Sequence, residues 1–259
     1  MKKITYLYII YLLLPIFLLA VGSFGQSWMN TLLPKGFTLD WYLELLHSTS
    51  YRNALLMSLQ VCVTVCLVNL LVVAPLVYTL QLLNASWIKS LFRISALMPI
   101  AVPELVIGFG FILAFSSSTL PWLGSTWLLI IGHWVLTFPY FFFSLSADIE
   151  KSPLKTLDRV AQSFGASALK RFVTVFLPLA SQSILTGLLT VAAISLGEFQ
   201  LSNLIAGFMN RTYPTLLLQA FYGATGLACA ATIILLLLAT FISLTSNFLN
   251  WSHSKGRLQ

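Results

Sequence analysis

Six long apolar runs, separated by short polar stretches, constrain this chain more than any other feature of its sequence. Each run is long enough to cross the hydrocarbon core of a bilayer as a helix, which takes about 20 residues. Only 8% of the residues are charged, whereas a soluble domain carries about 25%. We therefore expect an all-α integral membrane protein, with residues 1–259 forming one domain of about six transmembrane helices. The runs are residues 4–24, 55–82, 94–115, 125–146, 184–206 and 226–249.

The first run follows Met1, Lys2 and Lys3 and could be a secretory signal peptide. It continues to Ala20, which is longer than the roughly 7–15 apolar residues of a signal peptide, so we expect an uncleaved first helix. In the polar stretch that follows, residues 40–46 form an amphipathic segment that we expect to lie at the membrane interface.

The basic residues predict the orientation of the six helices. If the helices alternate in direction, eleven of the fourteen Lys and Arg residues fall on the side of the two termini, and Lys35, Arg52 and Arg211 fall on the other side. Because cytoplasmic segments are rich in Lys and Arg, we expect both termini in the cytoplasm of a multi-pass protein of the inner-membrane type. The eleven residues are Lys2, Lys3, Lys89, Arg93, Lys151, Lys155, Arg159, Lys170, Arg171, Lys255 and Arg257.

Two kinds of ligand are not expected. The net charge of +7 follows from the distribution just described, and the basic residues form no aromatic-interleaved stripe, so we expect no nucleic-acid partner. Cys62, Cys66 and Cys229 lie inside apolar runs without further Cys, His or Asp ligands nearby. We interpret them as small packing residues and expect no metal site and no cofactor.

The one sizeable stretch predicted in the cytoplasm, residues 148–181, has the signals of a helix, a glycine turn and a second helix. Pro153 suits the first helical position, Gly165 suits the left-handed residue that ends a helix, and Ser167 can cap the second helix. Pro178 comes just before the fifth run. The first helix has apolar residues at helical spacing, namely Leu154, Leu157, Val160, Ala161 and Phe164.

This apolar face has two interpretations. The segment is either an amphipathic hairpin that rests on lipid headgroups, or a docking element whose apolar stripe enters a groove of a soluble partner.

A spaced pattern in the same stretch carries a family resemblance. It consists of Arg159-Val160-Ala161, three residues, Gly165, nine residues, Val175, one residue, and Leu177-Pro178. This resembles the loop of binding-protein-dependent ABC importer permeases, which has Glu-Ala-Ala, three residues, Gly, nine residues, Ile, one residue and Leu-Pro. The glycine, the Leu-Pro pair and the spacing match, while arginine replaces the family's glutamate and valine replaces its first alanine.

The resemblance extends over about residues 50–250. Pro99–Pro103, followed by Gly108-Phe109-Gly110, is similar to the family's third span, and Ser195–Phe199 is similar to a fifth-span segment. The nearest group is the permeases for polyamines, phosphonates, ferric iron and thiamine. The resemblance therefore implies a type I ABC importer permease fold and a small polar solute of this kind.

In that family the loop docks in a groove of the ATPase. The resemblance thus implies two ABC ATPase subunits, a second permease subunit and a periplasmic solute-binding protein as partners, besides membrane lipid. This sequence has no Gly-x-x-x-x-Gly-Lys-Ser/Thr phosphate loop, so we expect a transport subunit rather than an enzyme, with ATP hydrolysed by another chain. The docking residues that it implies are Leu157, Asp158, Arg159, Val160, Ala161, Phe164, Gly165, Leu177 and Pro178.

Polar residues inside the apolar runs are costly in a bilayer and mark candidate functional positions. Glu104 lies in the third run and is either a solute contact or gate, or a neutral structural residue. In the fifth run, Glu198, Gln200 and Asn203 are candidates for lining the solute pathway or forming a gate. Three further polar residues are expected to form hydrogen bonds between helices: His133, Gln60 and Asn69.

Two other functional classes remain as alternatives. A six-span membrane enzyme such as an intramembrane protease could use Ser195 with His133, but their local sequence resembles no nucleophile turn. A secondary carrier would need no docking hairpin and should contain internal repeats, which are not visible in this sequence.

Overall fold

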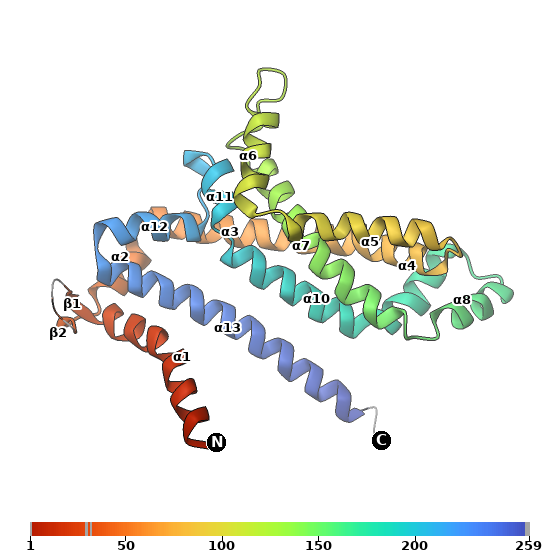
Figure 1. Cartoon of the computed structure of the whole chain (residues 1–259), viewed down its shortest axis with the longest axis horizontal. Helices are drawn as coiled ribbons and strands as arrows, with labels where there is room; N and C mark the ends of the chain where they lie inside the picture. The colour runs from red at the N-terminus through yellow and green to blue at the C-terminus, as the bar shows by residue number, and fades with distance from the viewer. Residues whose placement is uncertain (1, 29–30, 32, 257–259) are drawn as a thin grey trace.

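The computed structural model describes residues 2–28, 31 and 33–256 and shows a mostly helical chain (Figure 1). Met1 and Arg257, which enter the prediction for the termini, lie outside the described residues. The elements in chain order are α1 (Lys2–Ser23), β1 (Gly25–Ser27), β2 (Lys35–Phe37), α2 (Asp40–His47), α3 (Thr49–Val68), η1 (Asn69–Val73), α4 (Ala74–Leu82), α5 (Ser86–Ala101), α6 (Glu104–Phe115), α7 (Thr126–Ile149), α8 (Leu154–Ser163), α9 (Ala168–Arg171), η2 (Phe172–Phe176), α10 (Leu177–Gly197), α11 (Gln200–Ile205), η3 (Phe208–Asn210), α12 (Tyr213–Gly223) and α13 (Thr225–Gly256).

Several of these helices can cross a membrane. Four segments of the described chain are long and apolar enough, and the bent pair α5–α6 makes a fifth. The described side chains of α13, from Thr225 to Phe241, form a further apolar helix, and its backbone stays helical to Gly256. The four segments are Ile4–Ser23, Thr49–Leu82, Thr126–Ile149 and Ala168–Gly197.

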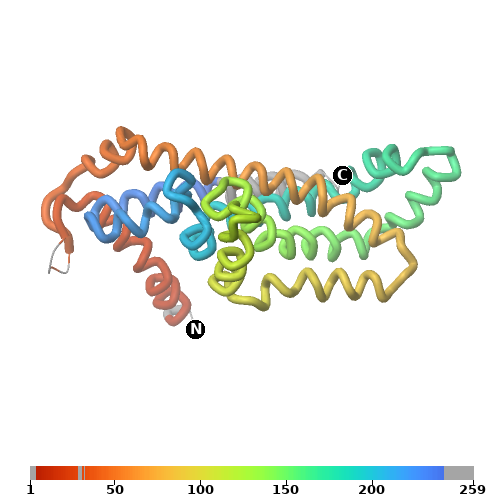
Figure 2. Tube along the Cα trace, turned by 90° about the horizontal axis from the view of Figure 1, so that it is seen from above, coloured from red at the N-terminus to blue at the C-terminus, as the bar shows by residue number. Residues whose placement is uncertain are grey.

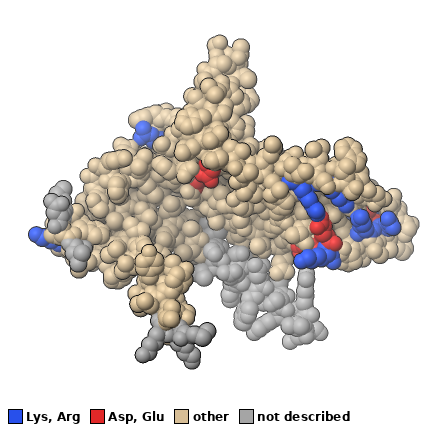
Figure 3. All heavy atoms as spheres, viewed as in Figure 1, with Lys and Arg blue, Asp and Glu red and all other residues tan. Residues whose placement is uncertain are grey.

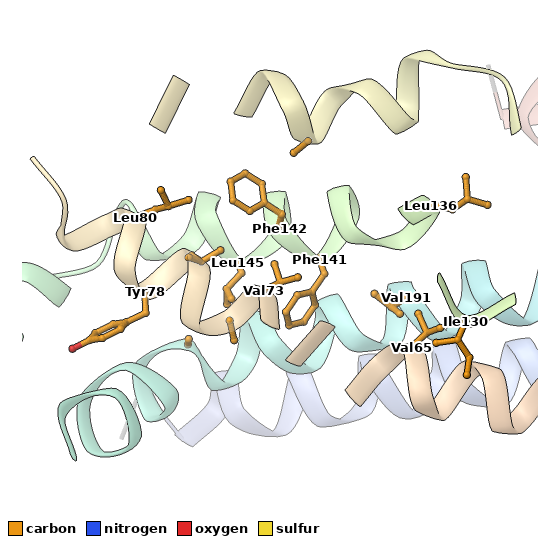
Figure 4. Close-up of a cluster of buried hydrophobic side chains, with 14 of the residues drawn as sticks. Val65, Val73, Tyr78, Leu80, Ile130, Leu136, Phe141, Phe142, Leu145 and Val191 are labelled. Atoms are coloured by element: carbon orange, nitrogen blue, oxygen red, sulfur yellow. The ribbon is translucent and has the colours of Figure 1, made fainter. Parts of the chain in front are cut away.

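The centre of the bundle is formed by α3–η1–α4, α7 and α10, which pack side by side along the long axis of the molecule (Figures 1 and 2). Their contacts are almost entirely aliphatic and aromatic, which gives the close packing typical of a protein interior. Figure 4 shows part of this core, with Val65, Val73, Tyr78, Leu80, Ile130, Leu136, Phe141, Phe142, Leu145 and Val191.

A small β-hairpin at one end of the bundle was not anticipated by the all-α prediction. Its strands β1 and β2 are antiparallel, with Gly25 opposite Phe37. The amphipathic segment predicted for residues 40–46 is helix α2, and the Trp41 Nε1–H donates to the Gly25 carbonyl at 2.8 Å. A hydropathy pattern does not predict strands of three residues each, because they are short and lie next to a much longer apolar run.

The helices of the predicted third span are bent sharply. α5 begins at Ser86, inside the stretch predicted as a loop, and α6 leaves it at an angle of 98°. The break is at Val102, which is extended (φ −96°, ψ 129°), and Pro103 follows it. Proline disfavours the helical conformation in the residue before it, so the elbow has a local cause. Glu104 is therefore the first residue of α6 rather than a residue in the middle of a straight span.

The helix of the predicted fifth span also differs from the expectation. It runs without interruption from Ala168 to Gly197, so Pro178 lies inside it instead of preceding it. The π-helical segment η2 comes just before this proline, and the Leu177 N–H bonds to the Phe172 carbonyl five residues back. A π segment widens one turn, which lets the helix accommodate a residue that cannot donate a backbone hydrogen bond.

Candidate functional site

The turn between α8 and α9 has the geometry that the sequence predicted. Gly165 has φ +76°, and the Ala166 N–H donates to the Ala161 carbonyl at 3.1 Å while the Gly165 N–H donates to the Gln162 carbonyl at 2.9 Å. This is the hydrogen-bond pattern of a helix that ends at a left-handed glycine. A Cβ added at Gly165 would meet no atom within 4 Å, so the backbone conformation rather than space requires glycine.

The second helix also begins as predicted. The Ser167 hydroxyl accepts a hydrogen bond from the Lys170 N–H at 3.3 Å, which satisfies one of the free donors at a helix N-terminus. The two short helices are therefore held in a defined hairpin by signals that lie within a few residues of the turn.

A buried polar node holds α8 against the bundle. The Asp158 side chain is only 4% exposed; it accepts a hydrogen bond from the Tyr78 hydroxyl of α4 at 2.6 Å and lies 3.2 Å from the Arg171 Nε of α9. The Tyr78 ring packs against Phe172 and Phe176 of η2, with centroids 5.4 and 5.2 Å away. Asp158, which the resemblance placed among the docking residues, thus faces inward and joins three helices.

The opposite face of α8 is apolar and open. Leu157, Val160 and Phe164 are 42%, 50% and 86% exposed, an unusual arrangement for large apolar side chains at the end of a helix hairpin. Leu157, Val160 and Ala161 line one wall of a groove of about 490 Å³. Its other wall comes from the start of the long helix, with Thr174, Val175, Pro178 and Leu179.

Basic residues are frequent at this end of the molecule. Lys151, Lys155, Arg159 and Lys170 are all exposed, and Figure 3 shows basic side chains gathered at the end of the molecule that carries α8. The predicted docking residues are therefore divided: Leu157, Val160, Ala161 and Pro178 meet at the groove, Arg159 and Phe164 are exposed but do not line it, and Leu177 is half-buried.

A second polar cluster lies in the bundle where α10 ends. The carboxylate of Glu198, which is 5% exposed, accepts hydrogen bonds from the Leu201 N–H at 2.6 Å and from the Ser202 N–H at 2.9 Å. It also accepts one from the Ser202 hydroxyl, and the His133 Nε2 is 3.4 Å away. Glu198 thus caps α11 and fixes the break between α10 and α11, where hydropathy predicted one continuous span.

His133 bonds across helices as predicted. Its Nδ1 lies 2.9 Å from the Ser195 Oγ and its Nε2 lies 2.9 Å from the Ser202 Oγ, which ties α7 to α10 and α11. Asn69 likewise donates to the Thr137 Oγ1 at 3.2 Å, whereas Gln60 is exposed on α3. The Ser195–His133 pair has the spacing of a nucleophile and its base, but both side chains are at most 3% exposed, so a peptide substrate does not reach them.

The predicted pathway residues lie in two neighbouring hollows. Glu104, Glu198 and Gln200 line one of about 410 Å³, together with Ala193, Ile194, Gly197 and Phe199. Asn203 lies in the other, also of about 410 Å³, where Arg211 stacks on the Phe208 ring at 4.4 Å and donates to the Gln219 side chain at 2.8 Å. Helix α11 contributes to both hollows, with Gln200 in the first and Asn203 in the second.

Sequence reasoning did not find the partners that these residues use. Tyr78 lies 80 positions from Asp158 and Ser202 lies 69 positions from His133, and neither residue stands out in its own apolar run. The one available signal was a hydroxyl group on a predicted membrane helix, since such groups form hydrogen bonds to other helices.

Comparison with known proteins decides which family has this architecture. Residues 71–250, which include the α8–α9 hairpin and the Glu198 cluster, match the family described as binding-protein-dependent transport system inner membrane component. This chain belongs to that family. The permease is 30% identical over 195 residues to a Salmonella typhimurium protein named for 2-aminoethylphosphonate transport, PhnV, and the match covers 74% of this chain and 71% of the relative.

Other relatives agree with this assignment. The permease is 24% identical to the putrescine transport system permease protein PotI of Escherichia coli, over 81% of this chain and 75% of the relative. Its fold matches a subunit in the crystal structure of a bacterial alginate ABC transporter in complex with an alginate pentasaccharide-bound periplasmic protein. That match has a TM-score of 0.75 and 17% identity and covers 95% of this chain and 91% of the other. The predicted ABC importer permease fold is confirmed, and the enzyme and secondary-carrier alternatives are not favoured.

Proposed function

We propose that this permease forms half of the solute pathway of an ABC importer and is coupled to a separate ATPase subunit through α8. One observation carries the proposal: α8 is fixed to the bundle by buried Asp158, yet it presents Leu157, Val160 and Phe164 to the outside. A helix held rigidly on one face and apolar on the other can transmit a displacement from a partner to the membrane helices. Because the family is one of transport components, ATP hydrolysis belongs to the partner chain.

The remaining parts of the assembly follow from the family. The complete importer contains two ATPase subunits, a second permease subunit, either another copy or a paralogue, and a periplasmic solute-binding protein. The uneven distribution of the basic residues supports a bacterial inner membrane with both termini and α8 in the cytoplasm. The structure of the alginate transporter in complex with a periplasmic protein supports the last partner.

The solute we propose is a small polar molecule such as a phosphonate, a polyamine, iron or thiamine. The names of two relatives, for 2-aminoethylphosphonate and putrescine, support this class. Glu104, Gln200 and Asn203 are among the polar side chains of the two hollows, and Glu198, which caps α11, is the candidate gate residue. Uptake of each solute by vesicles that contain the complete importer tests the class, because only the transported solute should accumulate in an ATP-dependent way.

Coupling through α8 is tested by two substitutions. In Gly165→Val, a β-branched residue is forced to positive φ, which destabilises the turn by about 1 kcal/mol or more. In Leu157→Asp, a charge is placed in the groove. We expect both variants to insert normally, to bind the ATPase subunit more weakly and to lose ATP-driven uptake.

The matched control is Gly223→Val at the end of α12. An added Cβ at Gly223 also meets no atom within 4 Å, but this glycine does not have positive φ. The control should bind the ATPase subunit and transport normally. If Gly165→Val and Leu157→Asp also do so, α8 is an interfacial hairpin and the proposed coupling is wrong.

A further inference from the structure

The docking helix α8 carries exposed charge of one sign. Its three charged residues are Lys155, Asp158 and Arg159, of which Lys155 and Arg159 are exposed and Asp158 is buried. Lys155 and Arg159 are four residues apart and therefore lie on the same side of the helix. At about 100° per residue, this side is turned away from Leu157 and lies about 100–140° around the helix from Val160, so the two charges are on the outward surface of α8 and do not line the groove. A partner that encloses the exposed side of α8 meets two adjacent positive charges.

These charges are not neutralised by the chain itself. Among the described side chains, which are those of residues 4–28, 31 and 33–241, no ion pair to Lys155 or Arg159 occurs. The three acidic residues at this end of the bundle are engaged elsewhere: Asp158 with Tyr78 and Arg171, Glu150 with Arg93, and Asp148 with Ser183. Lys155 and Arg159 therefore face water and are available to carboxylates of a partner.

The position of α8 favours a protein over the lipid surface as that partner. The helix α3–η1–α4 has 34 residues and is about 51 Å long, against about 30 Å for the hydrocarbon core. In Figures 1 and 2, α8 lies beyond the ends of α4 and α5, and Phe164 at its far end is 86% exposed. At this height the helix offers apolar side chains on one side and two positive charges further round, which matches a protein surface with an apolar pocket and carboxylates beside it.

We propose that the ATPase groove that receives α8 is acidic, with carboxylates that pair with Lys155 and Arg159. The inference rests on the proposed function, because it names the chemistry of the partner that α8 docks into. Arg159 stands where the family has a glutamate, so the charge at this position is reversed. The inference therefore predicts that this permease binds ATPase subunits with a negative groove and does not bind those with a positive groove.

The test measures binding of the full-length permease, in nanodiscs, to the purified ATPase subunit with which it supports ATP-driven uptake. The double charge reversal Lys155→Glu/Arg159→Glu should weaken binding about tenfold or more. Binding of the unchanged permease should weaken as salt is added, whereas binding of the double variant should strengthen, because salt then screens repulsion. Arg159→Lys should retain most of the affinity.

Arg52→Glu is the matched control, since it reverses one exposed charge on the first turn of α3, at the other end of the bundle. It should leave the affinity unchanged. Unchanged or tighter binding of Lys155→Glu/Arg159→Glu would overturn the proposal. An effect confined to nanodiscs that contain phosphatidylglycerol, and missing in phosphatidylcholine, would also overturn it, because the charges would then act on lipid.

Failure of this inference differs from failure of the proposed function. If Gly165→Val weakens ATPase binding but the charge reversal does not, docking through α8 stands and the groove is not acidic. If neither substitution changes binding, α8 does not dock and both proposals are wrong.

Discussion

Removing one hydroxyl, in Tyr78→Phe, should loosen α8 without changing the surface that α8 presents. The hydroxyl donates to the buried Asp158 carboxylate at 2.6 Å, and a hydrogen bond to a charged group contributes about 1.5–3 kcal/mol. Arg171, 3.2 Å from the same carboxylate, retains part of the interaction. We therefore expect the free energy of opening α8 to fall by about 2 kcal/mol, which corresponds to roughly 30-fold more opening.

Amide hydrogen exchange of residues 154–163 measures this opening directly, because exchange of a locally unfolding helix follows its opening free energy. The ring of Tyr78 stays packed on Phe172 and Phe176, so the membrane bundle should keep its thermal stability. Since the exposed face is unchanged, the ATPase subunit should still bind, but less solute should be taken up per ATP hydrolysed.

Two controls make the result specific. Tyr42→Phe removes a hydroxyl that donates to Ser23 at 2.8 Å, far from α8, and should leave α8 exchange unaltered. A double-mutant cycle of Tyr78→Phe with Asp158→Asn should show a coupling energy of about 1 kcal/mol or more. Unchanged exchange of α8, or a coupling energy below about 0.5 kcal/mol, would refute the view that this node holds the docking helix.

Three further predictions concern the rest of the molecule. In Lys151→Cys the thiol should react only with reagent added from the cytoplasm, and in Lys35→Cys only from the periplasm; the reverse labelling would overturn the predicted orientation. Glu198→Gln leaves one buried donor of the cap unsatisfied, which costs about 1–3 kcal/mol, so uptake should fall while membrane insertion, measured by protease protection, persists. Gly207→Ala brings a Cβ to 2.7 Å from the Gly124 carbonyl oxygen, and the resulting shift should lower the melting temperature, whereas unchanged melting would show that the two loops separate easily.

The α8–α9 hairpin was predictable because its signals are local. Gly165 ends α8 and Ser167 begins α9 through backbone contacts with residues at most about four positions away, and both have the predicted structural roles. Apolar runs of sufficient length likewise predicted the membrane helices, because lipid leaves a chain few other ways to satisfy its backbone.

The parts that were missed depend on contacts between distant residues or on breaks inside apolar runs. Hydropathy does not register the elbow at Val102, since both sides of it are apolar, although Pro103 was a usable signal. The inward orientation of Asp158 depends on Tyr78, and nothing in a single sequence connects two residues that meet only in the folded bundle. The same holds for the cap that Glu198 provides to α11.

The two π-helical segments have a consequence for the length of this chain. Each lies within a long helix, η1 between α3 and α4 and η2 between α9 and α10, and each holds one residue more than an α-helical path needs. Deleting one residue from Asn69–Val73 would therefore let this segment wind as a regular α-helix while the helix beyond it kept nearly the same rotation. Asn69 would keep its place beside Thr137, and Tyr78 would still reach Asp158. An extra residue in a regular α-helical turn would instead rotate everything beyond it by about 100°. The π-helical segments thus absorb a difference of one residue in chain length without changing how α8 faces the membrane core.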